Sequence, residues 1–119
     1  MFKVLERSHD NVIGVEVGGD ITLEDIKAGE AAFEELIAKY DKINWLCIWT
    51  NTHYTTMRAF YEDAMWMLKH LKNFDRMAVV SDKWWKKLLI KTDGMIFGEK
   101  YFDVEDLEKA WAYVEGEDA

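Results

Sequence analysis

Apolar and polar residues alternate near the start of the chain. From residue 13 to residue 17 every second residue is apolar, which is the spacing of a strand with one buried face, and Val12 is an extra apolar residue at its start. A second apolar segment, residues 2–7, precedes it, and His9, Asp10 and Asn11 between the two are typical turn residues. The pattern therefore predicts an N-terminal β-hairpin.

After the hairpin, helical and strand patterns take turns. Thr22 and Asp25 have the spacing of a capping box, in which each side chain satisfies a free amide at the start of a helix. The run 43–49 is almost continuously apolar, which is typical of a strand covered on both faces. The predicted helices are 22–40, 57–71, 82–91 and 104–114, and the predicted strands are 43–49, 77–80 and 101–102.

Strands that alternate with helices favour a mostly parallel sheet with right-handed crossovers. Together with the hairpin, this order predicts an α/β fold with a mixed sheet of about five strands and about four helices. The 119 residues are expected to form one domain, residues 1–119.

Composition narrows the function classes. The net charge of -8 argues against nucleic-acid binding, because phosphate backbones require clustered cations. The single cysteine, Cys47, excludes an internal disulfide and is predicted to be a buried apolar side chain. The N-terminus does not resemble a signal peptide, and no apolar run approaches the ~20 residues of a membrane span. We therefore expect a cytoplasmic protein without an integral membrane segment.

A set of motifs spreads over nearly the whole chain. It comprises Gly19-Asp20-Ile21-Thr22 with Asp25, Phe74-Asp75-Arg76-Met77-Ala78-Val79-Val80 with Trp84-Trp85, Ile96-Phe97, Phe102, and Ala110-Trp111. These motifs and the order of elements resemble the SpoIIAA-like (STAS-type) family of small bacterial α/β proteins. The resemblance implies that fold, and a stand-alone domain of uncertain function. The general layout is also similar to that of lipid-binding CRAL-TRIO-type domains, as an analogy only.

The resemblance also suggests a regulatory alternative. STAS-type antagonists of anti-sigma factors carry a phosphorylatable serine at the start of the helix after the third strand. The matching segment here, residues 50–56, contains no serine. A phosphorylation-controlled regulator would have to use Thr50, Thr52, Thr55 or Thr56 instead.

Segment 50–56 is also the predicted ligand site. Ligands of open α/β sheets bind beyond the carboxyl ends of parallel strands, and this hydroxyl-rich segment follows such a strand. Aromatic residues nearby could supply an apolar wall for a small amphiphile, either apolar or anionic, or for a partner protein. The predicted site residues are Trp49, Thr50, Thr52, Tyr54, Thr55, Phe60, Trp84 and Trp85.

The adjacent tryptophans have a competing interpretation. Neighbouring residues on a helix differ by about 100 degrees, so Trp84 and Trp85 cannot place both rings on one face. The pattern favours both rings completing the core, with Lys83, Lys86 and Lys87 solvating the helix. The alternative is that one ring is exposed and, beside these lysines, contacts an anionic amphiphile.

Trp66 lies off the apolar stripe of its helix, which is centred near Ala64 and Leu68. Tryptophan is enriched at interfaces, so Trp66 is a candidate contact for a homodimer or a partner protein. The competing interpretation is that its ring lies flat against neighbouring side chains.

The titratable residues do not form a recognisable catalytic or metal-binding set. His9, His53 and His70 belong to three different elements, whereas a metal site needs converging ligands. Cys47 and His53 are six positions apart and separated by a strand end, which is too far for a nucleophile and its base. We therefore predict a non-catalytic domain without a metal or cofactor.

Overall fold

A five-stranded sheet forms the centre of the protein in a computed structural model that describes residues 1–81 and 98–117, and only the backbone of residues 51–53. Its strands follow one another in chain order, with β1 antiparallel to β2 and the other pairs parallel. The strands are β1 Phe2–Val4, β2 Val12–Ile21, β3 Ile43–Tyr54, β4 Phe74–Val80 and β5 Lys100–Phe102. The helices are α1 Leu23–Tyr40, α2 Met57–Lys69 and α4 Leu107–Val114, with short 3-10 turns η1 Leu71–Asn73 and η2 Val104–Asp106. The α/β fold, the hairpin and the mixed, mostly parallel sheet predicted from the sequence are confirmed.

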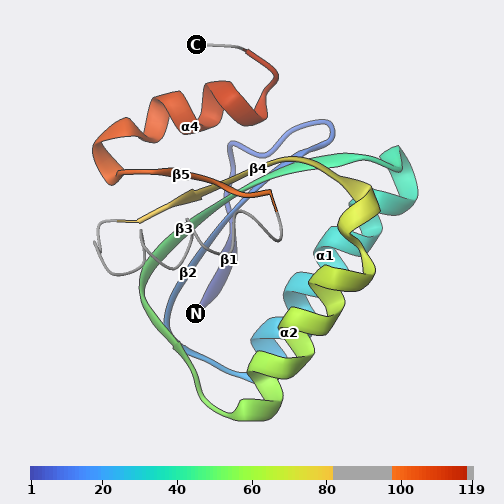
Figure 1. Cartoon of the computed structure of the whole chain (residues 1–119), viewed down its shortest axis with the longest axis vertical. Coiled ribbons are helices and arrows are strands. Elements are labelled where there is room, and N and C mark those ends of the chain that lie inside the picture. Colours follow the sequence, from blue (N-terminus) through green and yellow to red (C-terminus); the bar gives the residue numbers. More distant parts are fainter. Residues whose placement is uncertain (82–97, 118–119) are drawn as a thin grey trace.

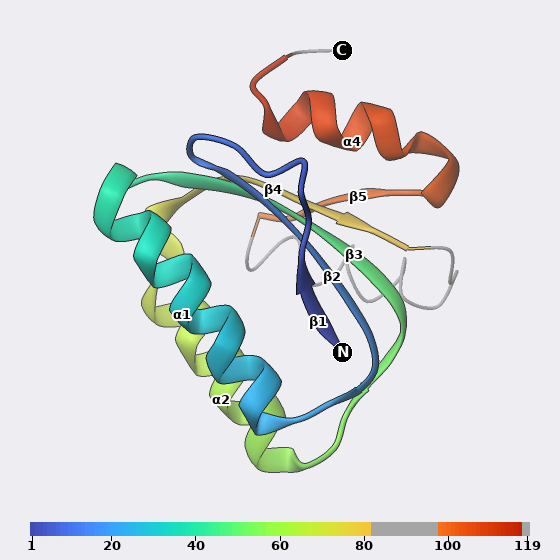
Figure 2. The same ribbon diagram turned by 180° about the vertical axis from the view of Figure 1, so that it is seen from behind.

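Helices cover the sheet on both faces. Helices α1 and α2 lie side by side on one face, and α4 lies on the other (Figures 1 and 2). Residues of β3 alternate between the two layers, since Trp45 packs with the α1 and α2 side and Leu46 with the α4 side. This double burial explains the continuous apolar run predicted to be a strand covered on both faces.

Helix α1 begins at the predicted capping box. The Thr22 hydroxyl accepts from the Asp25 amide at 3.1 Å, and the Asp25 carboxylate accepts from the Thr22 amide at 3.1 Å. Both bonds satisfy amides that the first helical turn leaves without partners. The N-terminus of α1 is thus fixed directly after the end of β2.

Strands β2 and β3 are longer than predicted. They pair from Val12 opposite Asn44 to Ile21 opposite Tyr54, with an irregularity at Gly18 and Gly19. The predicted strand 43–49 is therefore too short, because the backbone through Tyr54 belongs to β3, and residues 55 and 56 lie between β3 and α2. Glycines that look like a break in the sequence instead allow β2 to continue through a bulge.

Helix α2 faces the sheet with a different stripe from the one predicted. Its buried residues are Ala59 and Trp66, whereas Leu68 is 46% exposed. Trp66 packs beside Phe33 and Phe74, and its indole N–H donates to Glu34 at 3.1 Å. The expectation that Trp66 lies off the core is therefore wrong, and with it the reason for making Trp66 an interface residue.

Helix α4 closes the opposite face through a close contact between a ring and a strand. A Cβ added at Gly14 would lie 2.3 Å from Trp111, whose own side chain is buried. The side-chain amide of Asn44 also donates to the Val114 carbonyl at 2.6 Å and accepts from the Arg76 amide at 2.9 Å. These contacts join the end of α4 to β3 and β4.

The predicted helix 82–91 lies outside the described residues. The C-terminal helix predicted over 104–114 is present as η2 followed by α4. Among the helices that the structure describes, none combines the length and the apolar character needed to cross a membrane.

The contact between Gly14 and Trp111 yields the first prediction. Gly14→Ala should lower the free energy of unfolding by about 1–3 kcal/mol, because the new methyl group overlaps the indole ring. Urea unfolding followed by circular dichroism measures this loss. The control is the same substitution in a Trp111→Leu background, where the loss should be clearly smaller. Equal losses in both backgrounds would contradict the proposed overlap.

Candidate functional site

A cavity of about 340 Å³ lies between the sheet and the helices α1 and α2. This volume falls at the lower end of the range for small-molecule pockets, about 300–1,000 Å³. Most of its lining is apolar or aromatic. The apolar walls comprise Val15, Val17, Trp45, Cys47, Trp49 and Val79 from the sheet and Ile26, Phe33, Phe60, Ala64, Trp66 and Met67 from the helices.

The curved end of the β2–β3 pair shapes this cavity. The described pairing of β3 with β4 ends at Ile48 opposite Val80, but β3 continues beside β2 for six more residues, to Tyr54. Figures 1 and 2 show this extension curving toward the start of α1 and α2. Tyr54 and Phe60, whose rings meet edge to face at 5.3 Å, line the cavity there.

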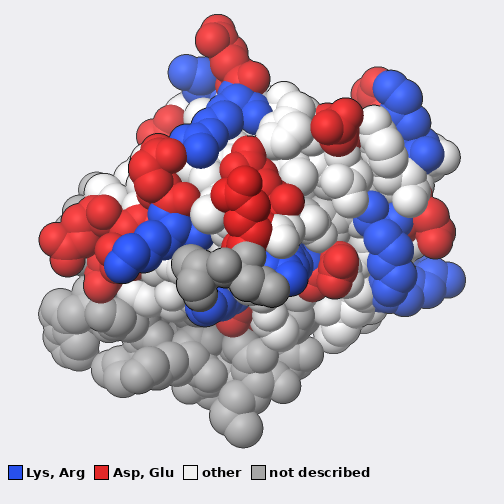
Figure 3. Space-filling model, turned by 90° about the horizontal axis from the view of Figure 1, so that it is seen from above, with Lys and Arg blue, Asp and Glu red and all other residues white. Residues whose placement is uncertain are grey.

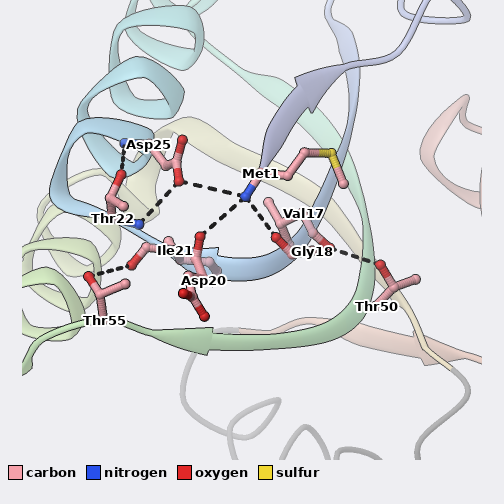
Figure 4. Close-up of polar contacts among 9 residues, drawn as sticks. All are labelled: Met1, Val17, Gly18, Asp20, Ile21, Thr22, Asp25, Thr50 and Thr55. Carbon is pink, nitrogen blue, oxygen red and sulfur yellow. Dashed lines mark hydrogen bonds and ion pairs between the residues drawn. The ribbon is translucent and has the colours of Figure 1, made fainter.

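Hydrogen bonds hold the same end of the sheet together. In Figure 4 the α-amino group of Met1 lies 2.7 Å from the Gly18 carbonyl and 3.7 Å from the Asp25 carboxylate. The Thr50 and Thr55 hydroxyls donate to the Val17 and Ile21 carbonyls, at 3.3 and 3.1 Å. These two threonine hydroxyls therefore tie β3 to β2.

The predicted site residues divide into three groups. Trp49, Tyr54 and Phe60 line the cavity, as a ligand wall requires. Thr50 and Thr55 do not line it, because they are bonded to the β2 backbone. The side chain of Thr52 and the residues Trp84 and Trp85 lie outside the described residues.

Several lining residues were not predicted as site residues. Cys47, expected to be fully buried, is partly exposed and lines the cavity. Gly29, which interrupts the apolar pattern of α1, lets Phe2 approach, since an added Cβ would lie 3.1 Å from the ring. Glu30 and Asp63 contribute carboxyl groups from α1 and α2.

Glu30 faces the cavity from α1. The spacing from Ile26 to Glu30 to Phe33 is four and then three residues, so Glu30 lies on the inner face. Its Oε2 atom is buried and has no hydrogen-bond partner within the described part of the chain. Burial, together with the neighbouring Glu62 carboxyl, raises the pKa of Glu30 to about 7.

Asp63 shares this environment on α2. The Tyr54 hydroxyl donates to its Oδ2 atom at 2.5 Å. Burial nevertheless raises the pKa of Asp63, and the charge of Glu62 adds to the effect. Burial and the nearby Asp63 carboxylate also raise the pKa of Tyr54, so its hydroxyl remains a donor.

A second buried polar atom lies in the cavity wall. Trp45 is only 5% exposed, and its indole N–H has no acceptor among the described residues. A buried donor without an acceptor costs about 1–3 kcal/mol. The wall therefore contains a donor at Trp45 and an acceptor at Glu30 that the described side chains do not use.

The acidic groups are not arranged to hold a metal. Within residues 1–81 and 98–117, no group of three or more His, Cys, Asp and Glu side chains is placed to coordinate an ion. On the face seen in Figure 3, acidic and basic side chains are interspersed among the described residues. The described residues on that face form no uniformly positive surface.

The raised pKa of Glu30 predicts a pH dependence of stability. The folded protein holds the Glu30 proton up to about pH 7, whereas an unfolded glutamate releases it near its ordinary pKa of 4.5. Stability from this group is therefore present below pH 4.5 and is lost as pH rises through about 7. Glu30→Gln cannot ionise and should be more stable than the wild type above about pH 7, by about 1 kcal/mol after solvent screening.

Thermal or urea unfolding from about pH 4.5 to 8 measures this difference, which should shrink toward the acidic end. Glu35→Gln is the matched control, because Glu35 is exposed on α1 and does not line the cavity. A Glu30→Gln variant with no gain at alkaline pH would contradict the assigned environment.

Comparisons with known proteins agree with the fold. The SpoIIAA-like family model matches residues 12–115. Among solved structures, the chain is similar to an uncharacterized protein with a SpoIIAA-like fold from Shewanella loihica PV-4, at 21% identity and a TM-score of 0.78. That similarity covers 95% of this chain and 93% of the other. No curated protein matches. The chain belongs to the SpoIIAA-like family.

Proposed function

We propose that this SpoIIAA-like domain is a non-catalytic binding protein for a small, largely apolar molecule, held between the sheet and α1 and α2. The observation that supports the proposal is the aromatic cavity of about 340 Å³. Burial of a ligand's apolar surface there contributes about 25 cal/mol per Å².

The shape of the cavity supports a ligand more than a partner protein. It is bounded by strands on one side and by two helices on the other, with Trp45 and Trp66 in its walls. A concave, mostly apolar site with a few polar groups is the usual form of a small-molecule site. A protein surface would instead need a broad exposed area of contact.

The polar lining narrows the choice of amphiphile. Among the described lining residues, the one that carries a positive charge is Met1, whose α-amino group already pairs with Asp25. The remaining charged lining groups are Glu30, Asp63 and Glu99. An anionic headgroup would face like charges here, so the described lining supports an apolar body without an acid.

The alternative, a phosphorylation-controlled regulator, remains a prediction from the family resemblance. Thr55 is exposed just before α2, and Thr56 caps that helix by accepting from the Ala59 amide. Phosphate mapping of residues 50–56 in protein from its native cells tests it; an unmodified segment would count against it.

Binding should perturb the cavity tryptophans. Nitrogen-15 labelled protein titrated with octylamine, octanol and octanoate should show saturable shifts of the Trp45 and Trp49 indole N–H signals for at least one compound. The same compound should slow labelling of Cys47, the single thiol, by a maleimide, because Cys47 lines the cavity.

A variant that fills the cavity separates this effect from surface binding. Ala64→Phe places a ring in the cavity and should abolish both responses, since Ala64 is a lining residue. Ala38→Phe is the control, because Ala38 is exposed at the far end of α1 and does not line the cavity. Responses that persist in Ala64→Phe, or are absent for all three compounds in the wild type, would refute the proposed pocket.

A further inference from the structure

The polar groups of the cavity are concentrated on the helix side. Glu30 of α1 and Asp63 of α2 both line it, and Glu62 lies close enough to raise the pKa of both. Carboxyl groups are rarely buried without cationic partners. Lys27 favours the charged form of Glu30 but does not line the cavity, so it leaves the inner surface acidic.

Aromatic rings surround these carboxyl groups. Trp45, Trp49, Tyr54 and Phe60 all contribute to the same cavity. The faces of such rings attract cations, and the attraction grows when water is excluded. Aromatic walls combined with carboxylates are thus suited to an organic cation.

A buried acceptor without a donor supports a ligand group that donates hydrogen bonds. The Glu30 Oε2 atom has no donor, and the Trp45 indole N–H has no acceptor, among the described residues. Trp45 is 5% exposed, so solvent does not satisfy its N–H, and an ammonium group, which has no acceptor, does not satisfy it either. Native proteins rarely leave such groups unused unless a ligand or water completes them.

We infer that the cavity recognises a small apolar amine, whose protonated nitrogen lies at the carboxyl groups of Glu30 and Asp63 while its apolar body packs against the aromatic walls. The inference rests on the proposed function and names the ligand class. An ammonium group supplies the hydrogen-bond donors that Glu30 lacks and relieves repulsion among Glu30, Glu62 and Asp63.

Other occupants fit the described residues less well. A bare metal ion needs several converging ligands, and the described His, Cys, Asp and Glu residues do not provide a group of three. A fatty acid would bring a further carboxylate against Glu30 and Asp63. A neutral alcohol could hydrogen-bond to Glu30 but would leave the acidic charges uncompensated.

The test compares ligands of equal chain length that differ in charge. At about pH 8 octylamine is protonated and ordinary carboxyl groups are ionised. Calorimetric or nuclear magnetic resonance titration of the wild type should give an affinity for octylamine at least about tenfold above that for octanol, and octanoate should bind most weakly. Equal or stronger binding of octanol or octanoate would overturn the inference and leave the pocket intact.

Two variants test the assigned carboxyl groups. Glu30→Gln and Asp63→Asn keep the shape of each side chain but remove its charge, and each should reduce the preference for octylamine over octanol about tenfold. Glu35→Gln, an exposed charge change on α1, should leave the preference unchanged. Unchanged preference in both cavity variants, with native-like spectra, would also overturn the inference.

The outcomes separate the two proposals. If none of the three compounds binds the wild type in the Ala64-dependent manner, the pocket itself is refuted. If binding depends on Ala64 but does not favour the amine, only the ligand class is refuted. If the wild type prefers octylamine over octanol and Glu30→Gln loses this preference, both the pocket and the ligand class are supported.

Discussion

The long parallel pairing of β2 and β3 is the constraint on which the rest of the structure depends. It extends from Val12 opposite Asn44 to Ile21 opposite Tyr54 and bends at Gly18 and Gly19. Strands β2 and β3 stay paired beyond Ile48, the last residue at which the described pairing joins β3 to β4. The end of β2 leads directly into the cap of α1, and the end of β3 leads into the cap of α2. The position of both helices over the cavity therefore follows from this one pair of strands.

The two faces of the sheet are filled in different ways. On the α4 side, Trp111 fits against Gly14 so closely that no Cβ could be accommodated. On the α1 and α2 side, aromatic residues pack around Phe33, and Phe33, Trp45 and Trp66 also border a cavity of about 340 Å³. This close contact on the α4 side contrasts with the cavity on the α1 and α2 side. The cavity is bounded by particular side chains, among them Glu30 and Asp63, whose burial costs free energy.

The sequence predicted the fold better than it predicted the site. The continuous apolar run 43–49 and the capping box at Thr22 could be recognised because each depends on residues that are close together in the sequence. The ends of β2 and β3 were missed because their pairing is long-range, and the glycines that permit the bulge look like turn residues. Trp49, Tyr54 and Phe60 line the cavity, because β3 continues to Tyr54 and leads into α2. Thr50 and Thr55 do not line it, and a hydroxyl gives no indication in sequence of whether it faces a cavity or bonds to a neighbouring strand.

The carboxyl groups escaped prediction for a physical reason. The inner face of α2 includes Asp63 between the buried Ala59 and Trp66, so a stripe drawn through apolar residues alone has the wrong phase. A helix that turns Asp63 inward while Met57, Tyr61 and Leu68 remain exposed gives up apolar burial. The ring of His70 stacks on the ring of Trp66, with 4.2 Å between their centroids, and this contact helps to hold Trp66 on the inner face. Asp63 is held by Tyr54, which itself lies at the end of β3 and lines the cavity. Polar groups thus replace apolar ones in the core where the β2–β3 pair ends. There they line the cavity that the proposed amine would occupy.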